Sequence, residues 1–108
     1  MLSESKLQSN ILKYLRALSP KCWAIKASVC NERGVPDILC CYKGQFISFE
    51  VKAGKGRLTR PQQIQNERIR QADGRAVVVR SILDVTAVLE HVDKADAAER
   101  KDSLATED

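Results

Sequence analysis

Several features of other protein classes are missing from this chain of 108 residues. No apolar run approaches the roughly 20 residues that a membrane-spanning helix needs. The first residues, MLSESKLQSN, are too polar for a signal peptide. We therefore expect a cytoplasmic protein without a membrane segment, large enough for one hydrophobic core but not for two.

Cysteine and histidine patterns of metal-binding proteins are also missing. The four cysteines, Cys22, Cys30, Cys40 and Cys41, contain no C-x-x-C pair and match neither a zinc knuckle nor a disulfide framework. We interpret them as small, buried strand residues in a reducing compartment. Nothing near the single histidine, His91, suggests a ligand or catalytic role.

Charge is present in excess and is unevenly distributed. The net charge is +4, but residues 93–108 contain three basic and six acidic side chains. The first 92 residues therefore have a net charge of about +7, which favours a polyanionic partner such as nucleic acid.

The most informative stretch is GVPDILCCYKGQFISFEVK, which spans residues 34–52. It contains two candidate strands, 38–42 and 46–52, that are rich in β-branched and aromatic residues. Lys43 and Gly44 between them are a turn signal, so the stretch predicts a β-hairpin. Apolar residues on both faces of this hairpin indicate the middle of a helix-covered sheet.

Two acidic side chains face each other in this hairpin. If Lys43 and Gly44 form the loop, Asp37 lies directly opposite Glu50, with Cβ atoms roughly 5 Å apart. Lys52 then leaves the sheet on the same side as Glu50, because side chains alternate with period two. A bulge at Gly44 would instead place the carboxylates on opposite faces.

Facing carboxylates raise each other's pKa, which costs stability unless a cation lies between them. Hard oxygen ligands suit Mg²⁺, with Mn²⁺ as a substitute. Pro36 marks the beginning of a strand, where the carboxylate of Asp37 can reach a ligand. The alternative interpretation is structural, because E-x-K alone is a common pattern of surface strands.

The remaining elements follow from periodicity and capping signals. A first helix is capped by Ser3 or Ser5, and a strand follows over 22–29. Thr59 and Gln62 form a capping box that opens a poorly amphipathic helix over 60–72. A buried strand over 76–79 then leads to a last helix, which is capped by Ser81 and ends near Val92. A strand reached through a helix implies parallel pairing. From Asp93 onward we expect a frayed or disordered charged tail.

A glycine-rich basic loop follows the hairpin directly. Residues 53–60 contain Lys55, Arg57 and Arg60, and Arg68 lies on the helix after them. Next to a metal site, such cations would contact a sugar-phosphate backbone without reading its sequence. The alternative is a solvated turn.

The order helix, three strands, helix, strand resembles the PD-(D/E)XK nuclease superfamily, as do Pro36-Asp37, Glu50-Val51-Lys52 and Gln62. Within it, the runs GVPDI, FEVKAGKGRLTRPQQ and VVVRS resemble the VRR-NUC domain, found in small stand-alone phage and bacterial proteins and in a larger DNA-repair enzyme. The resemblance implies a restriction-endonuclease-like α/β fold over residues 1–92, with a mixed central sheet flanked by helices and residues 93–108 outside it.

The resemblance also implies roles for individual residues. Asp37, Glu50 and the carbonyl of Val51 would be metal ligands, Lys52 would orient or activate the attacking water, and Gln62 would complete the catalytic set. Glu4 would match the first-helix acid of the superfamily as a further ligand, although an acid at a helix N-terminus is also favourable by itself. The name-giving Val-Arg-Arg reads Val79-Arg80-Ser81 here.

We therefore expect a Mg²⁺-dependent DNA endonuclease of phage or bacterial origin that is selective for branched DNA, such as four-way (Holliday) junctions. The alternatives are a non-catalytic nucleic-acid-binding module and a sequence-specific, restriction-like enzyme. Paired nicks across a junction require two sites on one particle, which favours a homodimer. The large side chains of Tyr14, Trp23 and Tyr42 do not all fit inside so small a core, leaving aromatic surface for a partner.

Overall fold

The computed structural model describes residues 2–106 and, at the end of the last helix, side chains up to residue 101. The elements in chain order are α1 (Glu4–Arg16), β1 (Cys22–Lys26), β2 (Ile38–Tyr42), β3 (Gln45–Val51), α2 (Arg60–Gln71), β4 (Arg75–Val79) and α3 (Ile82–Thr106). This order agrees with the prediction, although β1 ends three residues earlier than expected.

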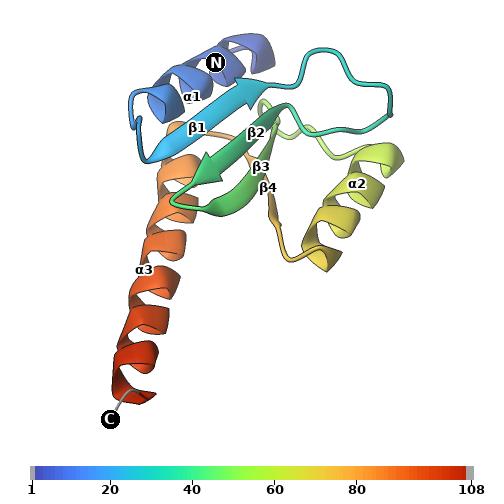
Figure 1. Cartoon of the computed structure of the whole chain (residues 1–108). Helices are drawn as coiled ribbons and strands as arrows, with labels where there is room; N and C mark the ends of the chain where they lie inside the picture. Colours follow the sequence, from blue (N-terminus) through green and yellow to red (C-terminus); the bar gives the residue numbers. More distant parts are fainter. Residues whose placement is uncertain (1, 107–108) are drawn as a thin grey trace.

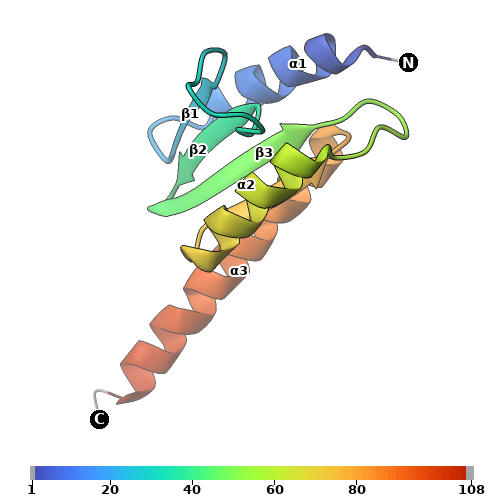
Figure 2. The ribbon, with the colours of Figure 1, turned by 90° about the vertical axis from the view of Figure 1, so that its right-hand side faces the viewer.

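The four strands form one mixed sheet in the order β1-β2-β3-β4. The pairs β1-β2 and β2-β3 are antiparallel, whereas β3 and β4 are parallel. Helices α1 and α3 lie on one face of the sheet and α2 lies on the other (Figures 1 and 2). The predicted α/β fold with a helix-flanked mixed sheet is therefore confirmed. Within residues 2–106, no helix is both long and apolar enough to cross a membrane.

The turn between β2 and β3 sets the register of the hairpin. Lys43 and Gly44 both have positive φ, 49° and 84°, as a two-residue type I′ turn requires. Tyr42 consequently pairs with Gln45, and the ladder continues without a bulge to Ile38 opposite Phe49. The predicted register is confirmed.

The hydrophobic core lies between the sheet and the α1–α3 layer. It consists of Leu7, Ile11 and Leu15 from α1, Val85, Leu89 and Val92 from α3, and the inward side chains of the strands, among them Ile38, Ile47, Phe49, Val51 and Val79. Among the cysteines, Cys22 and Cys40 are buried here as predicted, but Cys30 and Cys41 are exposed.

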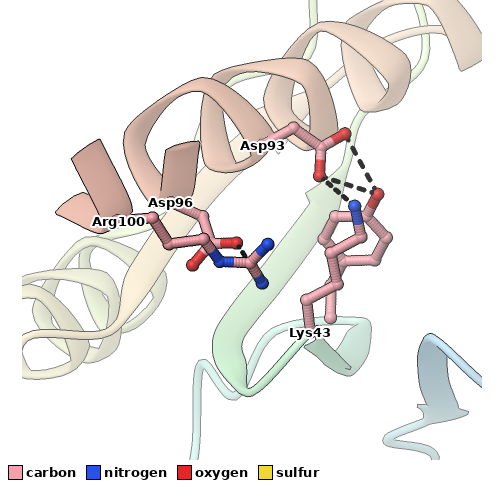
Figure 3. A network of polar contacts seen from close by, with 5 residues as sticks. Lys43, Asp93, Asp96 and Arg100 are labelled. Atoms are coloured by element: carbon pink, nitrogen blue, oxygen red, sulfur yellow. Dashed lines mark hydrogen bonds and ion pairs between the residues drawn. The ribbon is translucent and has the colours of Figure 1, made fainter. Parts of the chain in front are cut away.

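Helix α3 does not end near Val92, which corrects our prediction of a frayed tail from Asp93. It continues to Thr106 and extends beyond the sheet (Figure 1). Asp93 accepts hydrogen bonds from the Tyr42 hydroxyl at 3.1 Å and from the Lys43 amine at 2.7 Å, which fasten this part of α3 to the hairpin (Figure 3). The sequence from 94 to 106 contains four alanines and no glycine or proline, so helix propensity favours continuation.

Part of the α2 face of the sheet remains uncovered, which corrects the expectation of a hairpin covered by helices on both sides. Trp23, Cys41 and Phe46 are neighbours across β1, β2 and β3, and Ile25 and Leu39 are neighbours in the next row. We call these five residues the open face. Trp23 is 58% exposed and Phe46 is 42% exposed, because α2 covers only the β3–β4 half of the sheet.

Candidate metal and nucleic-acid site

Asp37 lies immediately before β2 and is held by the neighbouring strands. Its carbonyl accepts a hydrogen bond from the amide of Ala27 at 2.9 Å. Its side-chain Oδ2 accepts one from the amide of Val51 at 2.7 Å. Because the ladder ends with Ile38 opposite Phe49, Asp37 is the next residue and faces Glu50, as predicted.

The same contact orients the main chain of Val51. In an extended strand, the N–H and C=O groups of one residue point to the same side. Because the N–H of Val51 points to Asp37, its carbonyl is also directed to the β2 side of β3. This direction suits the predicted main-chain ligand.

Glu50 is a buried carboxylate, with only 1% of its surface exposed. The side-chain amide of Gln62 donates a hydrogen bond to Oε1 at 3.0 Å. No residue in the described part of the chain hydrogen-bonds to Oε2. Burial raises the pKa of Glu50 to about 8, and so do a hydrogen bond of the protonated carboxyl to Asp37 and the negative charge of Asp37, whereas the charge of Lys52 lowers it.

Gln62 is positioned by the capping box that opens α2. Thr59 Oγ1 accepts from the amide of Gln62 at 3.4 Å, and Gln62 Oε1 accepts from the amide of Thr59 at 2.9 Å. The oxygen of the side-chain amide therefore caps the helix while its nitrogen holds Glu50. Capping box and site contact are made by one side chain.

Glu4 approaches the same end of the sheet from α1. Its Oε1 accepts a hydrogen bond from the amide of Ala53 at 3.3 Å, and its charge adds slightly to the rise in the pKa of Glu50. Among the described residues, however, no group of three or more acidic, histidine or cysteine side chains is placed to hold a metal ion. The ligand role of Glu4 stays a prediction without geometric support.

Solved structures support the family resemblance. The chain superimposes on a structure described as a VRR_NUC domain with a TM-score of 0.69 and 27% sequence identity, over 82% of this chain and 95% of that one. This similarity in fold and sequence supports the VRR-NUC resemblance. A second structure, described as a VRR_NUC domain protein, has the same fold at 18% identity, with a TM-score of 0.64 over 84% of this chain and 88% of that one. No family model and no curated protein matches the sequence.

The similarity to VRR-NUC domains supports a nuclease-type domain, and the four cations predicted to bind nucleic acid lie on the surface. Lys55 and Arg57 in the loop between β3 and α2 are exposed, as are Arg60 and Arg68 on α2. All four cations are therefore available to solvent, as a phosphate contact requires.

Three contacts around the VRR-NUC site were not predicted from the sequence. Arg80 donates to the carbonyl of Gly54 at 2.8 Å and so ties the basic loop to the end of β4. Gly34, with φ of 76°, lies so close to α2 that an added Cβ would be 2.3 Å from the backbone of Pro61. Gln65 donates to Glu32 and to the carbonyl of Arg33. The Asp37 loop and the beginning of α2 are thus fixed together.

The residues present fit a hard divalent cation. Asp37 retains one free carboxylate oxygen, because only Oδ2 accepts from Val51. The buried Oε2 of Glu50 has no hydrogen-bond partner among the described residues, and a coordinated cation would satisfy it. Two carboxylate oxygens and one carbonyl, with the remaining positions filled by water, are a donor set typical of Mg²⁺.

Proposed function

We propose that this protein is a Mg²⁺-dependent DNA endonuclease. The observation that carries the proposal is the buried Glu50 carboxylate beside Asp37, with an unpaired oxygen and a pKa raised to about 8. When both carboxyls are ionised, the pair is unfavourable without a cation; in the metal-free protein a proton on Glu50 takes the place of that charge. The pair lies next to exposed cations suited to a phosphate backbone.

Asp37, Glu50 and the Val51 carbonyl would hold the metal, which supplies charge stabilisation at the scissile phosphate and a more acidic bound water. Gln62 fixes the Glu50 carboxylate through its 3.0 Å hydrogen bond. Lys52, whose charge lowers the pKa of Glu50, would donate a hydrogen bond to the attacking water or to a phosphate oxygen.

We further propose that the substrate is branched DNA, such as a four-way junction. The exposed cations would contact phosphates, and such contacts carry no base information. No element in the described part of the chain forms a separate domain that could read bases in the major groove. Selectivity would then come from the shape of the DNA, and the activity would belong in the cytoplasm of a bacterium or of a phage-infected host.

Cutting two strands of a junction requires two sites, so we propose that the working unit is a homodimer. The open face supports this part of the proposal, since it exposes Trp23 and Phe46 in one uncharged patch. Among the other large side chains, Tyr42 is only 7% exposed and Tyr14 packs against the core.

The test incubates the protein with plasmid and with four-way, flap and duplex oligonucleotides in Mg²⁺, Mn²⁺ or EDTA. We expect cleavage of branched substrates that requires metal and is absent in the Asp37→Asn variant. Binding without cleavage in any metal would favour a non-catalytic module, and cutting of linear duplex at one sequence would favour a restriction-like enzyme.

A further inference from the structure

Helix α2 buries one side chain fully, and that side chain is polar. Asn66 is 1% exposed, and it is the buried residue of α2. Its Nδ2 and Oδ1 atoms both lack a hydrogen-bond partner among the described residues. Leaving a buried amide unpaired destabilises the folded state. A leucine would avoid this cost, so the amide requires a partner.

The two ends of α2 fix what Asn66 faces. At the beginning of the helix, Gln62 bonds to Glu50 on β3. At its end, a Cβ added at Gly74 would meet both Ile69 and Phe46, at 2.8 and 3.0 Å, so these two side chains lie close together. Helix α2 therefore lies over the β3–β4 half of the sheet, packed against β4, with its beginning near Glu50 and its end near Phe46.

Ser48 and Asn66 occupy the middle of this contact. Asn66 follows Gln62 by four residues and lies on the same side of the helix. Ser48 precedes Glu50 by two residues and lies on the same side of the strand. Ser48 is fully buried, and its hydroxyl makes one long hydrogen bond, 3.5 Å to the carbonyl of Arg75. A buried polar strip of Glu50, Ser48 and Asn66 thus runs inward from the carboxylates.

We propose that Asn66 anchors an internal water site between α2 and β3. A buried water makes two to four hydrogen bonds, and the strip offers matching groups. The Asn66 Nδ2 donates, while the Asn66 Oδ1, the Ser48 hydroxyl and the Glu50 Oε2 accept.

The water site makes Asn66 a positioning residue. Through this water, Asn66 would fix the position of α2 relative to the sheet. The side-chain amide of Gln62, one turn earlier, is then held within hydrogen-bond distance of Glu50. This role rests on the proposed function, since it matters only if Glu50 is a metal ligand. The water site itself does not depend on that function.

The direct test is a high-resolution crystal structure of the metal-free protein. We expect an ordered water within about 3 Å of both the Asn66 amide and the Ser48 hydroxyl. An Asn66 amide that bonds directly to protein groups, or that lies in a dry contact, would overturn the water site.

The second test compares Asn66→Leu with Gln71→Leu, an amide-to-leucine change at an exposed position of the same helix. We expect Mn²⁺ to bind Asn66→Leu about tenfold more weakly, as for other groups that support metal ligands, and to bind Gln71→Leu as it binds the original protein. Equal Mn²⁺ affinity in a folded Asn66→Leu variant would overturn the positioning role. Should Asn66→Leu not fold, Asn66→Ser takes its place with the same expectation.

Failure of the proposed function gives a different result. An original protein that does not bind Mn²⁺ counts against the metal site, and the positioning role fails with it. The ordered water in the crystal would still decide whether Asn66 anchors a water site.

Discussion

Glu50 combines burial with a neighbouring carboxylate, and its protonation should therefore affect stability. Its pKa is raised to about 8 in the folded, metal-free protein, against roughly 4.3 in an unfolded chain. Between these values the folded state binds a proton that the unfolded state has released. The free energy of unfolding should fall as pH rises through this window, by at most about 1.4 kcal/mol per pH unit.

Urea unfolding in EDTA between pH 5.5 and pH 8 measures this dependence. The Glu50→Gln variant should lose the Glu50 contribution, because its side chain does not titrate. Saturating Mg²⁺ should also flatten the curve for the original protein, since the cation displaces the proton. An equally steep curve for Glu50→Gln in EDTA would assign the dependence to another group.

Replacing Asp37 and replacing Lys52 should have different effects on metal binding and cleavage. Asp37→Asn removes a ligand charge, so Mn²⁺ binding and cleavage should both be lost, while binding to branched DNA is kept by the exposed cations. Lys52→Ala should lose cleavage by at least about a hundredfold and keep Mn²⁺ binding. Calorimetry with Mn²⁺ separates them, and loss of metal binding in Lys52→Ala would refute its assigned role.

The pairing of Asp37 with Glu50 could be predicted because a two-residue turn fixes every later pair of the hairpin. A site role for Gln62 could be predicted only from the family resemblance, because twelve positions and a loop separate it from Glu50. The burial of Asn66 could not be predicted, because a polar residue in a polar helix gives no periodic signal. It depends on where α2 comes to lie on the sheet.

At the scale of elements, the Asp37 loop and α2 act as one unit through Gly34. An added methyl group at Gly34 would lie 2.3 Å from the Pro61 backbone and would also require a side chain at φ of 76°. Gly34→Ala should therefore push the beginning of α2 away and break the Gln62–Glu50 contact.

We expect Gly34→Ala to lower cleavage at least tenfold and to lower the melting temperature by several degrees. Gly44→Ala is the matched control, because Gly44 also has positive φ but an added Cβ there meets nothing within 4 Å. It should lose stability through backbone strain alone and keep its specific activity. Equal losses of activity in the two variants would mean that strain, not the contact with α2, is responsible.

The loop between β3 and α2 should supply binding energy without selectivity. Replacing Arg57 and Arg60 by glutamine should weaken binding to junction, flap and duplex DNA alike. The slope of log K against log salt should become shallower by roughly one unit for each lost phosphate contact. Fluorescence anisotropy at several salt concentrations measures both effects, and a loss confined to junctions would show that the loop reads shape.

Elements were predictable where local signals agree. The capping box at Thr59 and the Lys43-Gly44 turn were both correct, because each depends on neighbouring residues. The length of α3 was wrong, because we interpreted the loss of an apolar stripe after Val92 as the end of the helix. The contact of Asp93 with Tyr42 and Lys43 is a tertiary interaction, which periodicity does not contain.

At the scale of the whole molecule, the open face is the feature that a single chain leaves unexplained. Its five residues carry no charge, although 30% of the chain is charged. It therefore offers little to a polyanion and no repulsion to a second copy of a chain with net charge +4. Apolar surface with exposed aromatic side chains is typical of the centre of protein interfaces.

We expect sedimentation at micromolar concentration to show a dimer, and Trp23→Asp to be a folded monomer, because it places a charge at the centre of the interface. Leu83→Asp is the control, since Leu83 is 78% exposed on α3, outside the open face, and this variant should remain dimeric. On four-way junctions the Trp23→Asp monomer should still nick single strands but should lose paired, ligatable nicks, because one particle then carries one site. A monomeric original protein that still makes paired nicks would show that two sites on one particle are not required.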